Sequence, residues 1–146
     1  MSKSNSWENG LLLLLFNNTN FANVGDATGL RGSSAAGSLY VGLHTADPGE
    51  AGDQTTNEIT YTSYARVAVA RSGAGFTVSG NAVQFAATVS FPAGTGGSGT
   101  ATHWSLGTSA SGAGVLLYKG AITPNIVCGS GVTPQLASGT NVVTED

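Results

Sequence analysis

The chain has 146 residues, the length of one domain, and can bury a core without metals or disulfides. Only 9% of its residues are charged, and the net charge of −3 excludes a basic surface for nucleic acid or anionic lipid. A single cysteine, Cys128, excludes an internal disulfide framework and a CxxC metal site, and the one long apolar run, Leu11 to Phe16, is too short to span a bilayer.

The low fraction of charged residues also indicates whether the protein acts alone or within an assembly. It is combined with 22 glycines and an ordinary hydrophobic content of 40%, so the chain does not have the composition of a disordered segment. A soluble monomer usually carries many charges of mixed sign on its surface. The composition therefore favours a component of a larger assembly, in which neighbouring subunits cover much of the surface.

The first predicted element is a helix over residues 5–17. Asn5 is placed to cap it, and Glu8 follows three residues later as in a capping box. The run from Leu11 to Phe16 is apolar on every side of the helix. Two interpretations stay open: the run packs inside its own domain, or it inserts against a neighbouring subunit. The candidates for partner contact on this helix are Trp7, Leu11, Leu15 and Phe16.

Residues 18–38 form a predicted loop, and short strands separated by Gly-rich or Pro-containing turns fill residues 39–146. The strand candidates cover residues 39–44, 64–70, 76–78, 82–91, 100–106, 115–121, 125–128, 132–136 and 141–144. Eight or nine such strands are typical of an antiparallel sandwich or barrel. We expect an all-β protein with a short N-terminal α-helix: a single domain over residues 1–146, built as an antiparallel β-sandwich of the jelly-roll kind.

One segment resembles a phosphate-binding loop. Gly94–Gly99 matches the pattern GxGxxG. The dinucleotide-binding form of this pattern needs a strand before it, a helix after it and an acidic residue about 20 positions further on. Here a strand-like segment follows the motif, and Lys119 stands where the acid is needed. We therefore expect a flexible loop, and no cofactor.

Four of the eight acidic residues lie between Asp47 and Glu58. If Asp47 is counted as the first position of a calcium loop, Gly52 and Glu58 fit the sixth and twelfth, but the third and fifth offer no side-chain oxygen. We predict an exposed turn and no metal site, with a looser calcium site left open. The acidic candidates for contact with a partner are Asp47, Glu50, Asp53 and Glu58.

The sequence predicts no catalytic residues. His44 and His103 lie in strand patterns without metal-ligand spacing, and GxSxG is absent. A pocket that holds either histidine beside a serine and an acid would instead favour a small hydrolase. Cys128 has no adjacent cation, which indicates a buried and inert thiol. A shallow patch of exposed Trp or Tyr would favour a carbohydrate-binding module.

Several ordered segments resemble a family of small structural proteins of tailed bacteriophages, over nearly the whole chain from Trp7 to Asp146. These segments are Leu39–Gly49, Asn57–Glu58, Tyr64–Val67, Phe91–Ala93, Thr100–Trp104 and Leu116–Thr123. Members of this family are described as tail-fibre-like, or as capsid cement or decoration proteins.

The resemblance implies a virion structural protein without enzymatic activity. Its main implication is a capsid cement protein that binds the major capsid protein on the outside of the head and stabilises the expanded shell. Such a ligand acts by selective binding to one state. We expect a homo-oligomer, dimeric or trimeric, on the capsid surface, assembled in the bacterial cytoplasm, without nucleic-acid or membrane partners. The alternative is a tail fibre or receptor-binding module of the phage tail.

Overall fold

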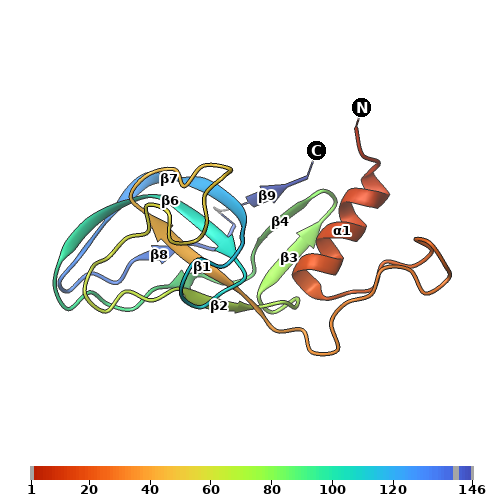
Figure 1. The fold of residues 1–146 in the computed structure, drawn as a ribbon, viewed down its shortest axis with the longest axis horizontal. Helices are drawn as coiled ribbons and strands as arrows, with labels where there is room; N and C mark the ends of the chain where they lie inside the picture. Colours follow the sequence, from red (N-terminus) through yellow and green to blue (C-terminus); the bar gives the residue numbers. More distant parts are fainter. Residues whose placement is uncertain (1, 140–141, 146) are drawn as a thin grey trace. The chain divides into compact units, whose positions relative to one another are not determined.

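The computed structural model describes residues 2–139 and 142–145. It confirms a mostly β protein with antiparallel sheets and a short helix at the N-terminus (Figure 1). The elements are α1 (Asn5–Asn17), β1 (Ser38–His44), β2 (Val67–Ala70), β3 (Phe76–Ser79), β4 (Ala82–Phe85), β5 (Val89–Ser90), β6 (Ser98–Gly107), β7 (Leu116–Gly129), β8 (Gln135–Leu136) and β9 (Val142–Thr144).

These elements divide between two compact units. Unit 1 contains the described residues up to Ser38, then Ala70–Thr88, and the described residues from Ala137 onward. Unit 2 contains Leu39–Val69 and Val89–Leu136. The single domain and the jelly-roll arrangement expected from the sequence stay predictions.

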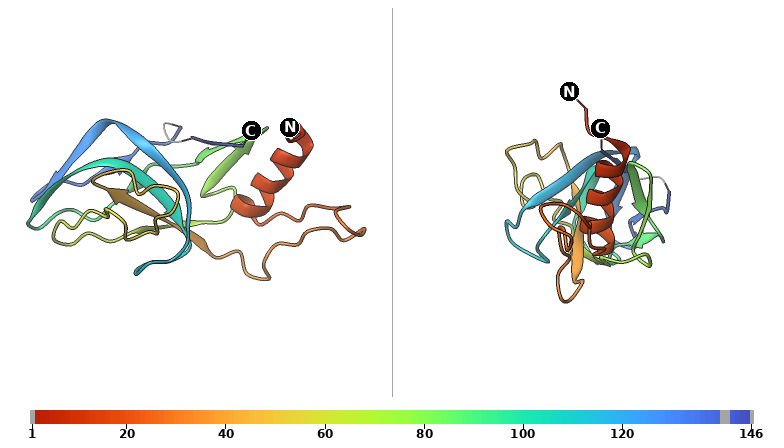
Figure 2. Two further views of the ribbon diagram at one scale, coloured as in Figure 1. Left: turned by 45° about the horizontal axis from the view of Figure 1, so that its top comes forward. Right: turned by 90° about the vertical axis from the view of Figure 1, so that its right-hand side faces the viewer.

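Unit 1 is built from α1 and the three-stranded sheet β3-β4-β9. The helix packs against β3 and β4, as Figure 2 also shows. Its buried face is the row Glu8, Leu12 and Phe16, spaced four residues apart. The ring of Phe16 meets that of Phe76 edge-on at 5.0 Å between centroids. The core of this unit combines aromatic and aliphatic side chains, namely Leu12, Phe16, Phe76, Val83, Phe85 and Val143.

Both ends of α1 are capped, the first by a side chain and the second by a backbone N–H. The sequence places the N-cap at Asn5, and this is wrong by one residue: Ser4 is the cap, and its Oγ accepts a hydrogen bond from the Trp7 amide at 3.4 Å. At the other end, Asn18 adopts the left-handed conformation (φ 55°), and its N–H donates to the carbonyl of Leu13. The Asn18 side chain also bonds both backbone groups of Ser33, which fixes the loop that follows.

Arg71 supplies the cation that the last turn of α1 lacks. Its Nε donates to the carbonyl of Leu15 at 2.6 Å, and its Nη2 donates to that of Leu14 at 2.9 Å. Its Nη1 donates to the carbonyl of Ala36 at 3.1 Å. The carbonyls of Leu14 and Leu15 belong to the last turn of α1, where a guanidinium both satisfies acceptors and matches the helix dipole. Arg71 therefore anchors α1 and the following loop to the segment that leads into β3.

Unit 2 contains the four-stranded sheet β2-β1-β6-β7 and the two-stranded sheet β5-β8. β1 and β6 pair antiparallel from Tyr40 opposite Gly107 to His44 opposite His103. β6 and β7 form a long curved hairpin (Figure 2), whose register shifts between Ala101 and His103. The core of this unit consists of Leu39, Val41, Leu43, Ile59, Tyr61, Val89, Phe91, Ala101, Trp104, Leu106, Ile122, Cys128 and Leu136.

Several strands differ from the sequence prediction. The strands predicted over 64–70 and 132–136 are shorter, β2 (Val67–Ala70) and β8 (Gln135–Leu136), and two further predictions are wrong in the number of strands. The strand predicted over residues 82–91 is two strands, because β4 pairs within unit 1 and β5 pairs with β8 in unit 2. The strands predicted over 115–121 and 125–128 are one strand, β7, which accommodates Pro124 where four residues face Thr102 alone. Asn141, part of the last predicted strand, lies outside the described residues.

Candidate functional site

A network of buried polar side chains lies in unit 2 beside the central strands β1 and β6. His44 and Ser105 are both fully buried, and His44 Nε2 lies 2.7 Å from Ser105 Oγ. His44 Nδ1 lies 2.8 Å from the carbonyl oxygen of Thr56. A carbonyl only accepts, so Nδ1 carries the proton and Nε2 accepts from the Ser105 hydroxyl. The imidazole thereby joins β1 to both β6 and the segment before Glu58.

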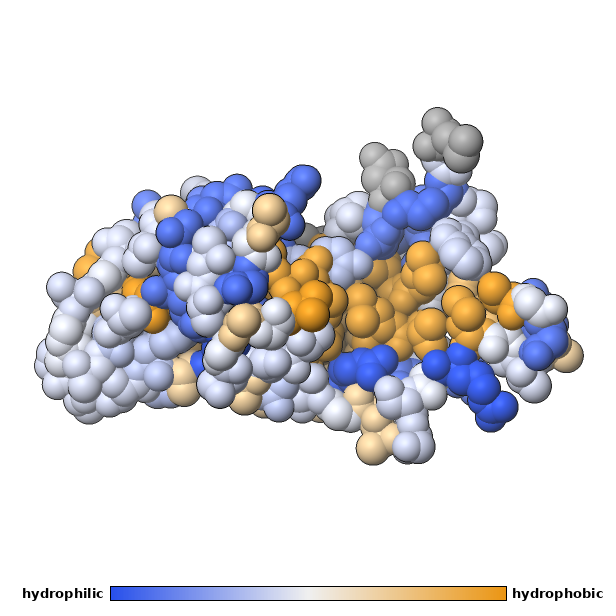
Figure 3. Space-filling view, in the orientation of Figure 1, coloured by the Kyte–Doolittle hydropathy of each residue, from blue (hydrophilic) through white to orange (hydrophobic). Residues whose placement is uncertain are grey.

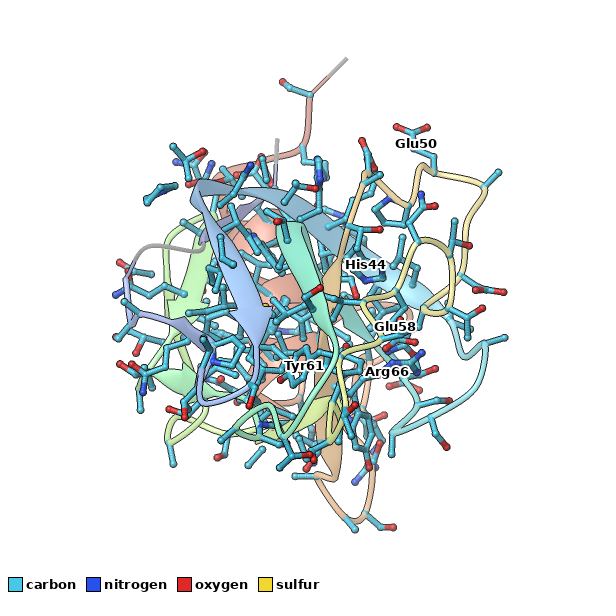
Figure 4. All side chains as sticks on the ribbon, turned by 90° about the vertical axis from the view of Figure 1, so that its left-hand side faces the viewer. His44, Glu50, Glu58, Tyr61 and Arg66 are labelled. Carbon is cyan, nitrogen blue, oxygen red and sulfur yellow. The ribbon has the colours of Figure 1, made fainter. Side chains whose placement is uncertain are left out.

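An ion pair continues this network toward β2 (Figure 4). Arg66 donates from Nε to one carboxylate oxygen of Glu58 at 2.6 Å and from Nη2 to the other at 2.7 Å. The Arg66 side chain is 2% exposed and that of Glu58 is 17% exposed. Tyr64 also donates its hydroxyl to Glu58, at 2.9 Å, and burial raises the pKa of Tyr64 well above its ordinary value of 10. Glu58 thus has three donors from two neighbouring residues, which is what a largely buried carboxylate requires.

Sequence reasoning did not identify Ser105 or Arg66, although one signal for the network was present. Gly42 interrupts an apolar strand, and an isolated strand glycine often marks a close approach. A Cβ atom at Gly42 would lie 3.1 Å from Ser105 Oγ and 3.4 Å from His44 Nε2. The glycine therefore leaves room for the polar network.

The geometry of His44 and Ser105 superficially matches a nucleophile and its base, but the surroundings do not suit catalysis. Both side chains have no exposed surface, so no substrate reaches the hydroxyl in this conformation. The Nδ1–H of His44 donates a hydrogen bond to a backbone carbonyl. In a Ser-His-Asp site, a carboxylate accepts this hydrogen bond and orients the base. A hollow of about 110 Å³ is lined by Thr77, Ser79, Ala82, Val83 and Gln84 of unit 1, and it contains none of these groups. The pair is best understood as a structural element of the core.

The burial of His44 predicts an acid-dependent loss of stability. Burial lowers the pKa of His44 below its ordinary value of 6.5, so above about pH 6.5 the imidazole is neutral in both states and its stabilising contribution is complete. Below that pH the unfolded chain takes up the proton first. The free energy of unfolding should therefore fall from about pH 6.5 down to the folded-state pKa.

Urea unfolding at a series of pH values checks this expectation. The variant His44→Gln keeps a neutral polar group at the position, and its stability should change less with pH across that window than that of the wild type. Identical pH dependences of the two proteins would contradict the assignment of this proton to His44.

Three of the four acidic side chains between Asp47 and Glu58 have partners, either within this segment or elsewhere in unit 2. Asp47 accepts from the Gly49 amide and pairs with Lys119 at 2.9 Å, and both partners lower the pKa of Asp47. Asp53 accepts from the amide and hydroxyl of Thr55, which lower the pKa of Asp53. Glu50 is exposed and projects from the segment (Figure 4). Of the four acidic candidates, Glu58 is therefore a structural partner of Arg66, and Asp47, Glu50 and Asp53 lie at least partly on the surface.

These carboxylates do not gather into a cluster in the part of the chain that the structure describes. Within residues 2–139 and 142–145, no group of three or more His, Cys, Asp or Glu is placed to hold an ion. Asp47 and Asp53 close local turns, and Glu58 faces Arg66. Asp47 and Asp53 each accept a hydrogen bond from the amide two residues later, as Asp does at the start of a turn. These turns account for the positions of the two residues in the apparent calcium-loop pattern.

Gln54 is a further buried residue that sequence reasoning missed. It has no exposed surface, and its Oε1 accepts from the Ser109 amide at 2.9 Å. Its side chain fills a slot between Gly107 and Gly114, where a Cβ atom would approach it to 2.1 Å and 2.2 Å. Arg66 Nη1 donates to the carbonyl of Ser109 at 3.0 Å. Gln54 and Arg66 thus hold both backbone groups of Ser109 and fix the base of the loop between β6 and β7.

The partner-contact candidates on α1 have different environments. Trp7 is 36% exposed, and its ring lies 5.4 Å from that of Phe21. Leu11 and Leu15 are half-buried, so both present apolar surface to solvent. Phe16 has no exposed surface and belongs to the core of unit 1. For Phe16 the structure favours the interpretation that the apolar run packs inside its own domain, while partner contact at Trp7, Leu11 and Leu15 stays a prediction.

The remaining sequence motifs have structural roles. β6 begins at Ser98, inside the GxGxxG match, so a strand follows the glycines where a dinucleotide site has a helix. Cys128 is 1% exposed, and burial raises the pKa of its thiol. None of the helices described has the length and apolar character that a membrane crossing requires.

Comparison with protein families places the chain beside proteins of tailed phages. A family model described as podophage GP4 fiber I protein gp80 matches residues 2–144, nearly the whole chain. No curated protein matches the sequence significantly. The matched region includes both compact units, so the family model extends over α1 as well as the sheets.

Proposed function

We infer that this chain, which belongs to the podophage GP4 fiber I protein gp80 family, is a structural component of a phage tail fibre. The observation that carries this proposal is the family match over residues 2–144. The family description names a fibre, which favours the tail over the capsid-cement role that the sequence resemblance put first. The phage structural role is common to both.

The architecture of the chain supports a structural role. In unit 2, the Asp47–Glu58 segment is tied to β1 by His44, and the β6–β7 loop is held at its base by Gln54 and Arg66. Such contacts position surface loops on a rigid sheet, as binding proteins commonly do. The half-exposed leucines of α1 provide apolar surface for neighbours in an assembly. We propose that the function is binding and assembly, without enzymatic activity.

The proposed partners are other fibre subunits, including further copies of this chain. A low surface charge suits contacts that stay covered in the virion, since charged groups are depleted at the centres of interfaces. The major capsid protein remains the partner under the alternative cement role.

Quantitative mass spectrometry of purified virions tests the proposal through the copy number of this chain relative to the major capsid protein and a known tail protein. A fibre component should match the stoichiometry of the tail proteins. A copy number that follows the major capsid protein would contradict the fibre role and support capsid cement.

A further inference from the structure

Residues 45–57, which we call the strap, follow β1 and are held in place mainly by polar contacts. Within the strap, all of which the structure describes, Pro48 and Gln54 are buried and the other residues are half-buried or exposed. In Figure 3 this part of unit 2 shows mainly hydrophilic and neutral residues. A segment that buries little apolar surface opens locally at a low cost in free energy. The strap is therefore able to open while the strands that it contacts stay folded.

The two ends of the strap meet beside β1. The amide and the hydroxyl of Thr45 donate to the carbonyl of Asn57, at 2.8 and 3.2 Å. Beyond this base, Asp47 pairs with Lys119 of β7 at 2.9 Å. The Asp47 side chain is 51% exposed, and an exposed ion pair of this kind contributes little to stability. A stronger attachment must therefore come from the buried contacts of the strap.

One buried contact between the strap and the sheet is made by His44. Its Nδ1–H donates to the carbonyl of Thr56 at 2.8 Å, and its Nε2 accepts from the Ser105 hydroxyl at 2.7 Å. The two bonds together require a neutral imidazole, because a protonated ring has two donors and no acceptor. Protonation therefore removes the acceptor of the Ser105 hydroxyl and places a charge on a side chain with no exposed surface.

The groups around His44 do not compensate for that charge. Burial has the largest effect and lowers the pKa of His44, and the charges of Arg66 and His103 lower it further. The hydrogen bond to the strap and the Glu58 carboxylate raise it. However, Glu58 already accepts hydrogen bonds from Arg66 and Tyr64. The proton is therefore better accommodated when the strap opens and water reaches the ring.

Gln54 extends the effect of opening to the loop between β6 and β7. Its amide donates to the carbonyl of Ala113 at 2.8 Å, and its Oε1 accepts from the Ser109 amide at 2.9 Å. Its buried Nε2 has no hydrogen-bond partner among the residues that the structure describes, which is unfavourable in the closed state. Opening of the strap brings Nε2 into water and removes both contacts to the loop. The strap and the loop are therefore released together.

We propose that the strap is an acid-sensitive switch: protonation of His44 detaches it from the sheet and frees the loop at residues 108–115, while the strands of unit 2 stay paired. The order of two surface segments then depends on one buried imidazole. This inference goes beyond the proposed function, because it is tested on the purified chain and stands whether or not the chain belongs to the tail.

Amide hydrogen exchange of the full-length chain, resolved by NMR at pH 7 and pH 5 and corrected for intrinsic exchange rates, measures this opening. The equilibrium constant for opening at the amides of Gln54 and Ser109 should rise about 10-fold between these pH values, because an imidazole released from burial binds its proton with a pKa near 6.5. The amides that pair β1 with β6 should stay protected at both pH values.

The two histidines of the chain provide the decisive variant and its matched control. His44→Gln keeps a polar group without the titrating ring and should abolish the rise, whereas His103→Gln should retain it. In the wild type, the NMR titration of the His44 ring should follow the same pH profile as the exchange at Gln54. Unchanged exchange between pH 7 and pH 5 would overturn the proposal. A rise that persists in His44→Gln, a ring that titrates apart from the exchange, or strap amides that lose protection only together with the strands would overturn it as well.

Discussion

Replacement of Arg66 by alanine is expected to lower the free energy of unfolding by about 3–5 kcal/mol, the usual effect of removing one partner of a buried ion pair. The Arg66 guanidinium is 2% exposed and makes two hydrogen bonds to Glu58 and one to the carbonyl of Ser109. Its loss leaves the carboxylate of Glu58 nearly buried without a counter-charge. Chemical unfolding followed by circular dichroism measures the change.

Two controls make the Arg66 experiment specific. Arg31 is exposed, so Arg31→Ala should change the stability by no more than about 0.5 kcal/mol. Arg66→Lys keeps the charge but loses the paired donors, and its effect should lie between those of wild type and alanine. If Arg66→Ala costs no more than Arg31→Ala, the ion pair does not organise unit 2.

Replacement of Phe16 by alanine should destabilise the protein by about 3–5 kcal/mol, the range found for large aromatic truncations in cores. Phe16 has no exposed surface and packs edge-on against Phe76. The change leaves a cavity between α1 and β3 that the surrounding backbone fills only in part. Thermal and urea unfolding measure the loss.

The control for Phe16 lies on the same helix. Leu13 is half-buried, so Leu13→Ala removes less buried surface and should cost clearly less than Phe16→Ala. Equal losses would mean that the row Glu8, Leu12 and Phe16 is not what holds α1 to its sheet.

The helix shows what the sequence could and could not provide. Its extent over residues 5–17 was predictable from the leucine run and the asparagines after it, and the structure confirms it. The face that packs was not predictable, because positions 11 to 16 are all apolar and no side is distinguished by polarity. The sheet decides it by covering Leu12 and Phe16 and leaving Leu11, Leu14 and Leu15 half-exposed.

For the strands, too, some features were predictable from the sequence and others were not. β1 and β6 follow apolar or alternating runs and were predicted within one or two residues. The break between β4 and β5 follows from their partners, since β4 pairs with β3 and β9 whereas β5 pairs with β8. Partner choice depends on contacts between distant residues, which local patterns do not contain.

The polar network was the least predictable feature. Ser105 and Arg66 lie 61 and 22 residues from His44 along the chain, and only the pairing of β1 with β6 brings Ser105 to the imidazole. Gln54 stands in a polar loop, where nothing in the sequence distinguishes a buried residue from an exposed one. Only Gly42 gave a local signal, and it marked a close approach without identifying the side chains involved.

The proposal that this chain is a component of a tail fibre is tested most directly by its location on the virion. An epitope tag at the C-terminus, labelled with antibody and viewed by electron microscopy of intact phage particles, reports that location. The fibre assignment predicts label on the tail and none spread over the head. Label distributed over the head surface, with none at the tail, would contradict it and restore the capsid-cement role.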